Sequence, residues 1–299
     1  MEKLGALAAF GTALCWSISA LYFEHATRRA GALAVNFWKV LFAIFYLAAA
    51  GLVMRGRPLP LDASLREWGF LAISGVIGFI IADYFLFNAY LMIGSRITVV
   101  FQALTPLFTA LMAFIFLGER MRAIRLAGMG VVVCGILMVV ISRQRGAEPT
   151  AAKGSAKGYL FAILSSVFQA GGLLFSKAGL ADGYSAIAGT QIRVITAIAG
   201  FGIQALLLRQ ANEVFIAPAR ESKVFRNIAI GAVFGPFLGV TFSLFALQNT
   251  DAGTASTLMA LNPVLIIIPS ILILKQKVKA MEIAGAFVAV CGTALFFLL

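Results

Sequence analysis

The sequence has few charged residues and almost no histidine. Of its 299 residues, 12% are Asp, Glu, Lys or Arg, His25 is the only histidine, and the mean hydropathy is +0.97. A soluble globular domain needs about 25% charged residues to cover its surface. The deficit therefore excludes a soluble fold and indicates a chain that is solvated by a lipid bilayer.

Motifs for catalysis and metal binding are also missing. The sequence has no G-x-S-x-G, H-E-x-x-H or Walker A motif. Its three cysteines, Cys15, Cys134 and Cys291, lie in apolar segments, where a thiol usually acts as a small hydrophobe. We therefore expect no enzymatic activity, no cofactor, no metal site and no disulfide.

The net charge of +12 could indicate a nucleic-acid partner. However, all Lys and Arg residues except Lys39 and Arg193, which is 24 − 2 = 22 of them, lie in short connections between apolar segments. Such residues typically anchor a protein at the membrane surface. We expect the bilayer and a small molecule as partners, with no nucleic acid and with a monomer as one possible state.

Ten apolar segments with at most one charge each fill the chain. Each has 17 to 25 residues, which matches the ~20 residues at 1.5 Å rise that cross a ~30 Å hydrocarbon core. The sequence therefore predicts an all-α integral membrane protein with ten transmembrane helices, at 4–23, 32–54, 68–90, 97–117, 126–142, 158–176, 184–208, 227–248, 254–274 and 283–299.

The two halves of the chain repeat each other. A polar linker, 143–157, separates a first five-helix repeat, 1–142, from a second, 158–299. A shift of 157 residues superimposes them: Thr105-Pro106 meets Asn262-Pro263, and Cys134-Gly135 meets Cys291-Gly292. Because five is odd, the second repeat must enter the membrane in the opposite orientation, which predicts an inverted repeat.

Small residues follow the same shift. Ser74, Gly78 and Ala82 in the third helix correspond to Gly231, Gly235 and Gly239 in the eighth. Both stripes have small-xxx-small spacing, which lets helix backbones approach closely in lipid. We expect the third and eighth helices to pack tightly against neighbours.

The charge distribution leaves the membrane orientation open. With the N-terminus inside the cell, 8 Lys and Arg residues of the connections lie in the cytoplasm and 22 − 8 = 14 lie outside, so the positive-inside rule favours the reverse. The first half alone favours the N-terminus inside by 7 to 3. Two similar halves in opposite orientations cannot both satisfy the rule.

Several short motifs recur at fixed places in the helices: Ala13-Leu14-Cys15-Trp16, Thr105-Pro106, Asn262-Pro263, and Phe116-Leu117-Gly118-Glu119 followed by Gly128 and Gly135. In these motifs the sequence resembles the EamA type of the drug/metabolite transporter superfamily, whose members are two fused five-helix repeats. The resemblance covers essentially the whole chain. The second half departs from the pattern, because Gln169 replaces the Trp16 equivalent and Leu274-Lys275-Gln276 stands where the first half has Leu117-Gly118-Glu119.

The resemblance implies export of small metabolites across the bacterial inner membrane, with both termini in the cytoplasm. The aromatic-rich helices look similar to the amino-acid exporter branch, including exporters of aromatic amino acids. We therefore expect a secondary transporter that works by alternating access. A lipid or lipid-carrier flippase and a channel are the alternatives.

Three charges lie within the apolar segments: Lys39, Asp83 and Arg193. A charge at a helix centre costs roughly 2.5 to 3.5 kcal/mol on insertion scales, so each needs a partner or a cavity. Lys39 and Asp83 both lie eight residues, or ~12 Å, below the same surface, and we expect an ion pair. The pair either neutralises two buried charges or makes Asp83 a proton-coupling carboxylate.

Arg193 has no acidic partner in the repeat pattern, because Val240 stands at the Asp83-like position. Its planar guanidinium suits the carboxylate of an amino acid. The alternative is hydrogen bonding to backbone carbonyls and to Gln191 or Thr196. We also predict that Trp16, Tyr84 and Gln169 contribute to substrate binding, together with Lys39 and Asp83.

Pro106 and Pro263 are related by the repeat. A proline inside a helix removes a hydrogen bond, and such breaks are tolerated where a neighbour or a cavity satisfies the freed carbonyl. The two prolines are therefore candidate gating kinks. Simple curvature of the helices is the alternative.

Overall fold

The computed structural model describes residues 2–117, 123–144, 155–181, 183–249, 255, 258–274 and 278–298. Within these residues the regular elements are all helical. Three of them, η1, η2 and η3, are π-helices. The elements are α1 (Glu2–Ala30), α2 (Ala32–Arg55), α3 (Leu65–Gly75), η1 (Val76–Ile81), α4 (Ala82–Ile93), α5 (Ser95–Gln102), α6 (Thr105–Leu117), α7 (Ala123–Gln144), α8 (Ala156–Gly179), α9 (Ala186–Leu207), η2 (Asn212–Ile216), α10 (Ala217–Arg220), α11 (Ser222–Ala232), η3 (Val233–Gly239), α12 (Val240–Asn249), α14 (Asn262–Leu265), α15 (Ile267–Leu274) and α16 (Ala280–Leu298).

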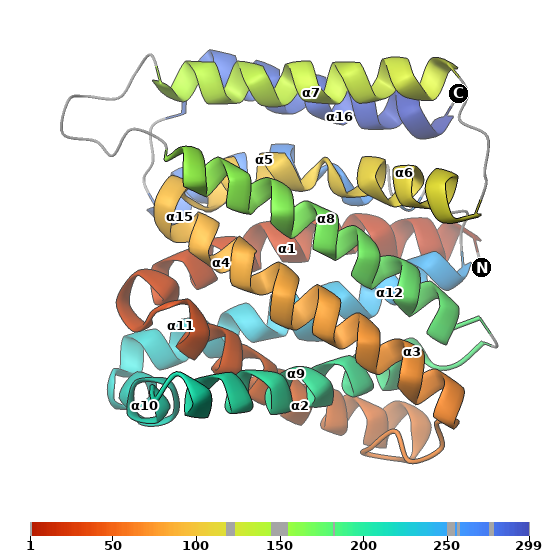
Figure 1. Cartoon of the computed structure of the whole chain (residues 1–299), viewed down its shortest axis with the longest axis vertical. Coiled ribbons are helices and arrows are strands. Elements are labelled where there is room, and N and C mark those ends of the chain that lie inside the picture. Colours follow the sequence, from red (N-terminus) through yellow and green to blue (C-terminus); the bar gives the residue numbers. More distant parts are fainter. Residues whose placement is uncertain are drawn as a thin grey trace.

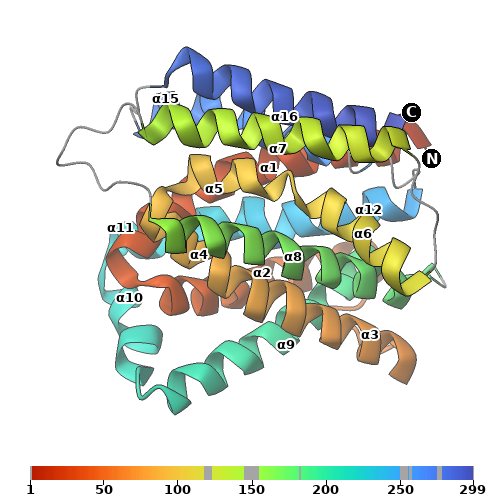
Figure 2. The same ribbon diagram turned by 45° about the horizontal axis from the view of Figure 1, so that its top comes forward.

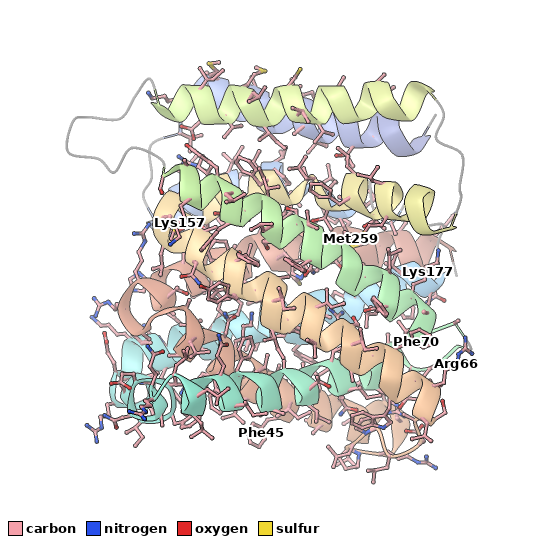
Figure 3. The ribbon with its side chains drawn as sticks, in the orientation of Figure 1. Phe45, Arg66, Phe70, Lys157, Lys177 and Met259 are labelled. Carbon is pink, nitrogen blue, oxygen red and sulfur yellow. The ribbon has the colours of Figure 1, made fainter. Side chains whose placement is uncertain are left out.

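Helical elements occupy each of the ten ranges expected from the sequence. Six continuous helical stretches of the described chain are long and apolar enough to cross a membrane, and three shorter apolar helices accompany them. Charged residues stand at the two ends of the helix bundle, as expected for helices that cross a membrane. Lys157 lies at one end, and Arg66 and Lys177 lie at the other (Figure 3). Phe45, which is 64% exposed, points outward between them (Figure 3).

The two halves are interleaved and antiparallel. In Figure 1, α1 and α8 run in opposite directions, and the chain begins and ends on the same side of the bundle. Each half also packs its first helix on the other half: α1 of the first half packs on α11, η3 and α12 of the second, and α8 of the second packs on α3, η1 and α4 of the first. In Figure 2, α7 and α16 form a pair along one edge. The described helices thus show two repeats related by a two-fold exchange.

Small residues position these contacts, as the sequence predicted. A methyl group added at Gly235 would lie 2.9 Å from the ring of Phe23, and one added at Gly239 would lie 2.6 Å from the Trp16 indole. In the other half, a methyl group at Gly172 of α8 would lie 2.9 Å from the Gly78 Cα. Both stripes therefore bring the helix axes into close contact.

Each stripe also contains a π-helical segment. η1 covers 76–81, and a shift of 157 residues places it on 233–238, within η3. A π-helix widens the backbone by one residue per turn, and such segments are often found at functional sites. Because the two segments coincide under the repeat, the widening belongs to the shared architecture of both halves.

Two helices are broken at matching points. The chain turns at Ala103 and Leu104 between α5 and α6, and at Ala260 and Leu261 before α14, again 157 residues apart. Pro106 and Pro263 therefore stand in the first turn of a new helix rather than inside one. At that position a missing N–H costs little, because it has no helical partner.

Candidate functional site

An ion pair lies in the middle of the first half. Lys39 of α2 donates to the Asp83 Oδ2 at 2.5 Å, and the side chains are 3% and 11% exposed. The predicted pairing of these two residues is therefore confirmed. It ties α2 to α4 at the point where η1 ends.

Aromatic rings surround the Lys39 ammonium on its other sides. The Nζ lies 4.0 Å from the centroid of the Phe87 ring, 5.7 Å from that of Phe23 and 5.8 Å from that of Phe79. Ring faces attract a cation, most strongly when water is excluded. The ammonium thus has one anionic partner and three aromatic ones in a closed environment.

Arg193 also contacts the Phe79 ring. Its Cζ is 5.0 Å from the ring centroid, and the residue is 2% exposed. The guanidinium makes no hydrogen bond or ion pair with a described residue, and its Nε is fully buried. The expected alternative partners are used elsewhere, because Gln191 donates to the Pro58 carbonyl and Thr196 to that of Ile192.

Gln169 comes close to Arg193 at the glycine stripe of η1. A methyl group at Gly78 would lie 2.8 Å from the Arg193 Nη2 and 3.8 Å from the Gln169 Oε1. Gly78 therefore provides the space in which both side chains end. Three elements that are distant in the sequence, η1, α8 and α9, converge on this point.

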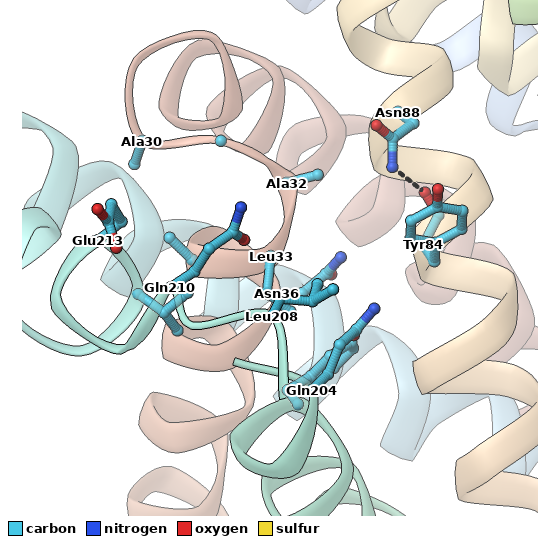
Figure 4. A pocket seen from close by; sticks show the side chains of 14 residues that line it. Ala30, Ala32, Leu33, Asn36, Tyr84, Asn88, Gln204, Leu208, Gln210 and Glu213 are labelled. Carbon is cyan, nitrogen blue, oxygen red and sulfur yellow. Dashed lines mark hydrogen bonds between the residues drawn. The ribbon is translucent and has the colours of Figure 1, made fainter. Parts of the chain in front are cut away.

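The other two predicted site residues lie elsewhere. Trp16 packs against Gly239 of η3. Gly239 corresponds to Ala82 under the 157-residue shift, and Ala82 precedes Asp83. Tyr84 is 43% exposed and lines a pocket of about 320 Å³ between α2, α4 and α9 (Figure 4). The structure thus groups Lys39, Asp83, Arg193 and Gln169 around η1.

The breaks at the two prolines are held by hydroxyl groups of the opposite half. The Ser166 hydroxyl of α8 donates to the Phe101 carbonyl at 2.9 Å, and the Ser165 hydroxyl accepts from Gln102. At the second break, the Ser17 hydroxyl of α1 lies 2.7 Å from the Asn262 Oδ1. These bonds replace helical ones that the breaks remove.

The expectation that three charges lie inside the bundle was incomplete. Glu24, Arg96 and Glu282 are also buried, at 3%, 5% and 6% exposure. Each stands one residue outside the apolar segment predicted for its helix, so counting charges within segments missed it. The helices extend further than the charge-free runs, because α1 reaches Ala30 and α16 begins at Ala280.

These three charges form a second polar network near one end of the bundle. Arg96 and Glu282 pair at 2.8 Å, joining α5 to α16. Glu24 accepts from Arg28 and from the backbone N–H and hydroxyl of Ser95. Each carboxylate here has an arginine as ion-pair partner, which indicates a role in holding helix ends together.

Breaks at symmetric points, buried charges and an internal inverted arrangement are features of membrane transporters. The EamA-like transporter family model matches the chain twice, at residues 3–141 and 156–298. The chain therefore belongs to the EamA-like transporter family, within the drug/metabolite transporter superfamily.

A solved structure confirms the fold. The structure titled "Crystal structure of protein" aligns with a TM-score of 0.67 and 18% identity, covering 100% of this chain and 98% of that one. None of the curated proteins matches the sequence. The likeness at this identity concerns the arrangement of the helices and says nothing of the cargo.

Proposed function

We propose that this membrane transporter is a secondary transporter that exports small polar metabolites, most of all amino acids including aromatic ones. All ten helical ranges cross the bacterial inner membrane as two inverted repeats, with both termini in the cytoplasm. The central support is Arg193, a guanidinium 2% exposed and without a hydrogen-bonding or ionic partner among the described residues. An anionic group of the cargo would satisfy it.

The geometry around Arg193 favours a planar carboxylate. Because Gly78 has no Cβ, the Nη2 can pack closely against η1; Gln169 brings its amide oxygen to the same place, and the Phe79 ring covers one face. A guanidinium binds a carboxylate through two parallel hydrogen bonds, which a point charge such as Lys cannot reproduce. The Lys39/Asp83 pair, whose ammonium also contacts the Phe79 ring, completes the polar surroundings of the cargo.

The two broken helices supply the movement. The chain already leaves the regular α-helical pattern at both breaks, where bonds such as Leu104 N–H to the Phe101 carbonyl are of the shorter turn type, and Pro106 and Pro263 have no N–H to give. The segments on either side can therefore change their relative angle at a small cost in helical hydrogen bonds. Each break is held by serines of the opposite half. Opening the bundle on one side of the membrane would therefore break the serine bonds at one helix break, while those at the other break remain. Exchanging these two symmetry-related states gives alternating access.

The test is uptake of labelled amino acids into proteoliposomes. Arg193→Lys keeps the charge and loses the planar fork, so the rate should fall about 10-fold or more, because one charged hydrogen bond contributes about 1.5 to 3 kcal/mol. Arg193→Ala should lose more. The matched control is Arg96→Lys, another buried arginine, whose partner is Glu282; this variant should retain the substrate preference of the parent.

The outcomes separate the candidate functions. Parental transport by a folded Arg193→Ala protein would refute carboxylate recognition. Movement of labelled lipid without amino-acid uptake would establish a flippase instead. Uptake that does not saturate would identify a channel.

A further inference from the structure

Three cations stand together at the end of the bundle opposite to the two termini. Figures 1 and 2 both show α10 at this end. Arg220 ends α10, Lys223 and Arg226 lie in the first turns of α11, and all three residues are exposed. None of them makes an ion pair or a hydrogen bond with a described residue. We call these three residues the basic group.

The acidic residues of the same segment do not neutralise the basic group. Segment 209–226 has four basic and two acidic residues. Of the two carboxylates, Glu221 pairs with Arg29 of α1. Glu213 of η2 has no ion pair with a described residue, but the exposed Arg209, also without one, offsets its charge. The surface therefore keeps an excess of positive charge that an anion would neutralise.

The basic group lies at the level of lipid headgroups. Lys223 and Arg226 share one face of α11 with the partly exposed Ile230, since residues three and seven apart lie on the same side of a helix. The opposite face is buried, with Val224 and Ile228 at 1% and 0% exposure. Because α11 begins at Ser222, the two cations lie within ~6 Å of its start, where the lipid-facing side reaches the membrane surface.

An aromatic row continues from the basic group along α2 and α11. The Phe225 ring packs on Trp38 and Phe42, with centroids 5.0 and 4.9 Å apart. The Phe42 ring stacks on that of Tyr46 at 6.3 Å, further along α2. All four rings are partly exposed, and Phe45 beside them is 64% exposed. Such residues favour the depth just below the headgroups, so the row offers acyl chains an apolar surface.

We infer that this surface binds an anionic phospholipid, with its phosphate on Arg220, Lys223 and Arg226 and its acyl chains along the aromatic row. An arginine binds phosphate through two parallel hydrogen bonds, and a lysine adds a point charge. An anionic headgroup fits better than a zwitterionic one, because the ammonium of the latter would be repelled by the excess positive charge. The inference is independent of the transport proposal, since Arg193 is buried inside the bundle.

The test uses the purified full-length protein in a neutral detergent. The rise of its melting temperature is followed as lipid is added, since a ligand of the folded state stabilises it. Dioctanoyl phosphatidylglycerol is the anionic probe and dioctanoyl phosphatidylcholine the zwitterionic one. The anionic lipid should act at an about 10-fold or lower concentration, because each cation beside an anionic headgroup contributes about 5-fold in affinity. Equal concentrations for the two lipids would overturn the proposal.

A triple variant locates the site. Arg220→Gln/Lys223→Gln/Arg226→Gln should raise the phosphatidylglycerol concentration needed about 10-fold or more. Its melting temperature without lipid should equal that of the parent, because the three side chains make no bond with a described residue. An unchanged lipid dependence in this variant would refute the site.

A matched triple variant separates a defined site from general attraction of lipid to a basic protein. Lys3→Gln/Arg66→Gln/Lys177→Gln removes three exposed cations from the opposite end and should leave the phosphatidylglycerol dependence unchanged. Equal weakening in both triple variants would contradict the proposal. In the parent, raising the salt from 0.15 M to 1 M shortens the Debye length from about 8 to about 3 Å and should reduce the preference for the anionic lipid.

The contribution of the acyl chains is tested with glycerophosphoglycerol, which has the same headgroup and no chains. It should not compete with dioctanoyl phosphatidylglycerol at equal concentration, because it cannot bury apolar surface on the aromatic row. Competition at equal concentration would show a site for free phosphate esters and would exclude the lipid.

Discussion

The regions around η1 and η3 have the same backbone conformation, but the side chains are polar beside η1 and apolar beside η3. Beside η1, Ser74 bonds the Ser176 hydroxyl and the Gly172 carbonyl, both at 2.7 Å. Beside η3, the equivalent position Gly231 packs on the ring of Phe23. Asp83 follows η1, whereas Val240 follows η3. The small-residue spacing thus maintains the shared architecture, while the Lys39/Asp83 pair of the first half has no counterpart in the second.

Among the variants that test this difference between the two regions, removal of Asp83 should have the largest effect on stability. Asp83→Leu makes the region after η1 resemble that after η3 but leaves the Lys39 ammonium buried without its anion. Breaking a buried pair on one side costs about 3 to 5 kcal/mol. The loss should appear as a lower melting temperature of the purified protein in detergent.

The double variant Lys39→Met/Asp83→Leu is the control for that experiment. An apolar pair of similar volume should recover most of the lost stability. A double variant as unstable as Asp83→Leu would show that the pair contributes more than charge neutralisation. Amino-acid uptake by the stable double variant would exclude proton coupling through Asp83.

Alanine at the two glycine stripes should separate packing from cargo recognition. Gly239→Ala places a methyl group 2.6 Å from the Phe234 carbonyl oxygen and from the Trp16 ring, and overpacking of this kind costs about 1 to 3 kcal/mol. Gly78→Ala meets the mobile end of Arg193 instead. We expect the first to lower the melting temperature more, and the second to reduce amino-acid uptake more. The reverse pattern would contradict the assignment of Arg193.

The ends of α2 and α9 allow a stabilising change. α2 is followed by Gly56 at φ 68°, and α9 by Arg209 at φ 55°, positions that correspond under a shift of 153 residues. A residue with a Cβ loses roughly 1 to 2 kcal/mol in this left-handed region. Arg209→Gly should therefore stabilise the protein by about 1 kcal/mol, measured as a raised melting temperature. Gly56→Ala should do the opposite.

The same two ends differ in their response to pH. Arg55 donates to Asp62 at 2.6 and 2.7 Å and lowers the pKa of that carboxyl below its ordinary value, whereas Arg209 has no ion pair with a described residue. The stabilisation is present above the unfolded pKa of about 3.9 and is lost as pH falls through the lower folded value. It should not exceed about 1 kcal/mol.

Melting temperatures of the parent and of Asp62→Asn measure this contribution. The two should differ most at neutral pH and converge in acid, below the folded pKa. A constant difference across the pH range would show that the hydrogen bonds, and not the charge, are responsible.

Much of the architecture follows from the sequence because lipid restricts the choices. Apolar length gives the helical ranges, and the 157-residue shift gives the packing of one half on the other. The Lys39/Asp83 pair could be predicted because both depths follow from a fixed rise per residue. The contact of Arg193 and Gln169 with Gly78 could not be predicted from residue spacing, because it depends on how α8 and α9 cross η1.

Other features lie beyond such reasoning. The π-helical segments have no residue signature, and their match in both halves emerges only from the folded backbone. Arg96 and Glu282 stand at helix ends, where the sequence cannot separate a solvated charge from a buried one. The helix ends, rather than the apolar spans, therefore limited the prediction of the buried charges.

The α7–α16 pair has a consequence for how the two halves came together. A methyl group at Gly135 would meet the Gly285 carbonyl at 2.6 Å, and one at Gly292 would meet that of Gly128 at 3.0 Å. Gly292 is the repeat of Gly135, and Gly285 that of Gly128. The seam is thus isologous, the geometry of a symmetric dimer joining two copies of one patch. A single ancestral five-helix chain would have carried this whole interface, and later fusion freed each copy to diverge.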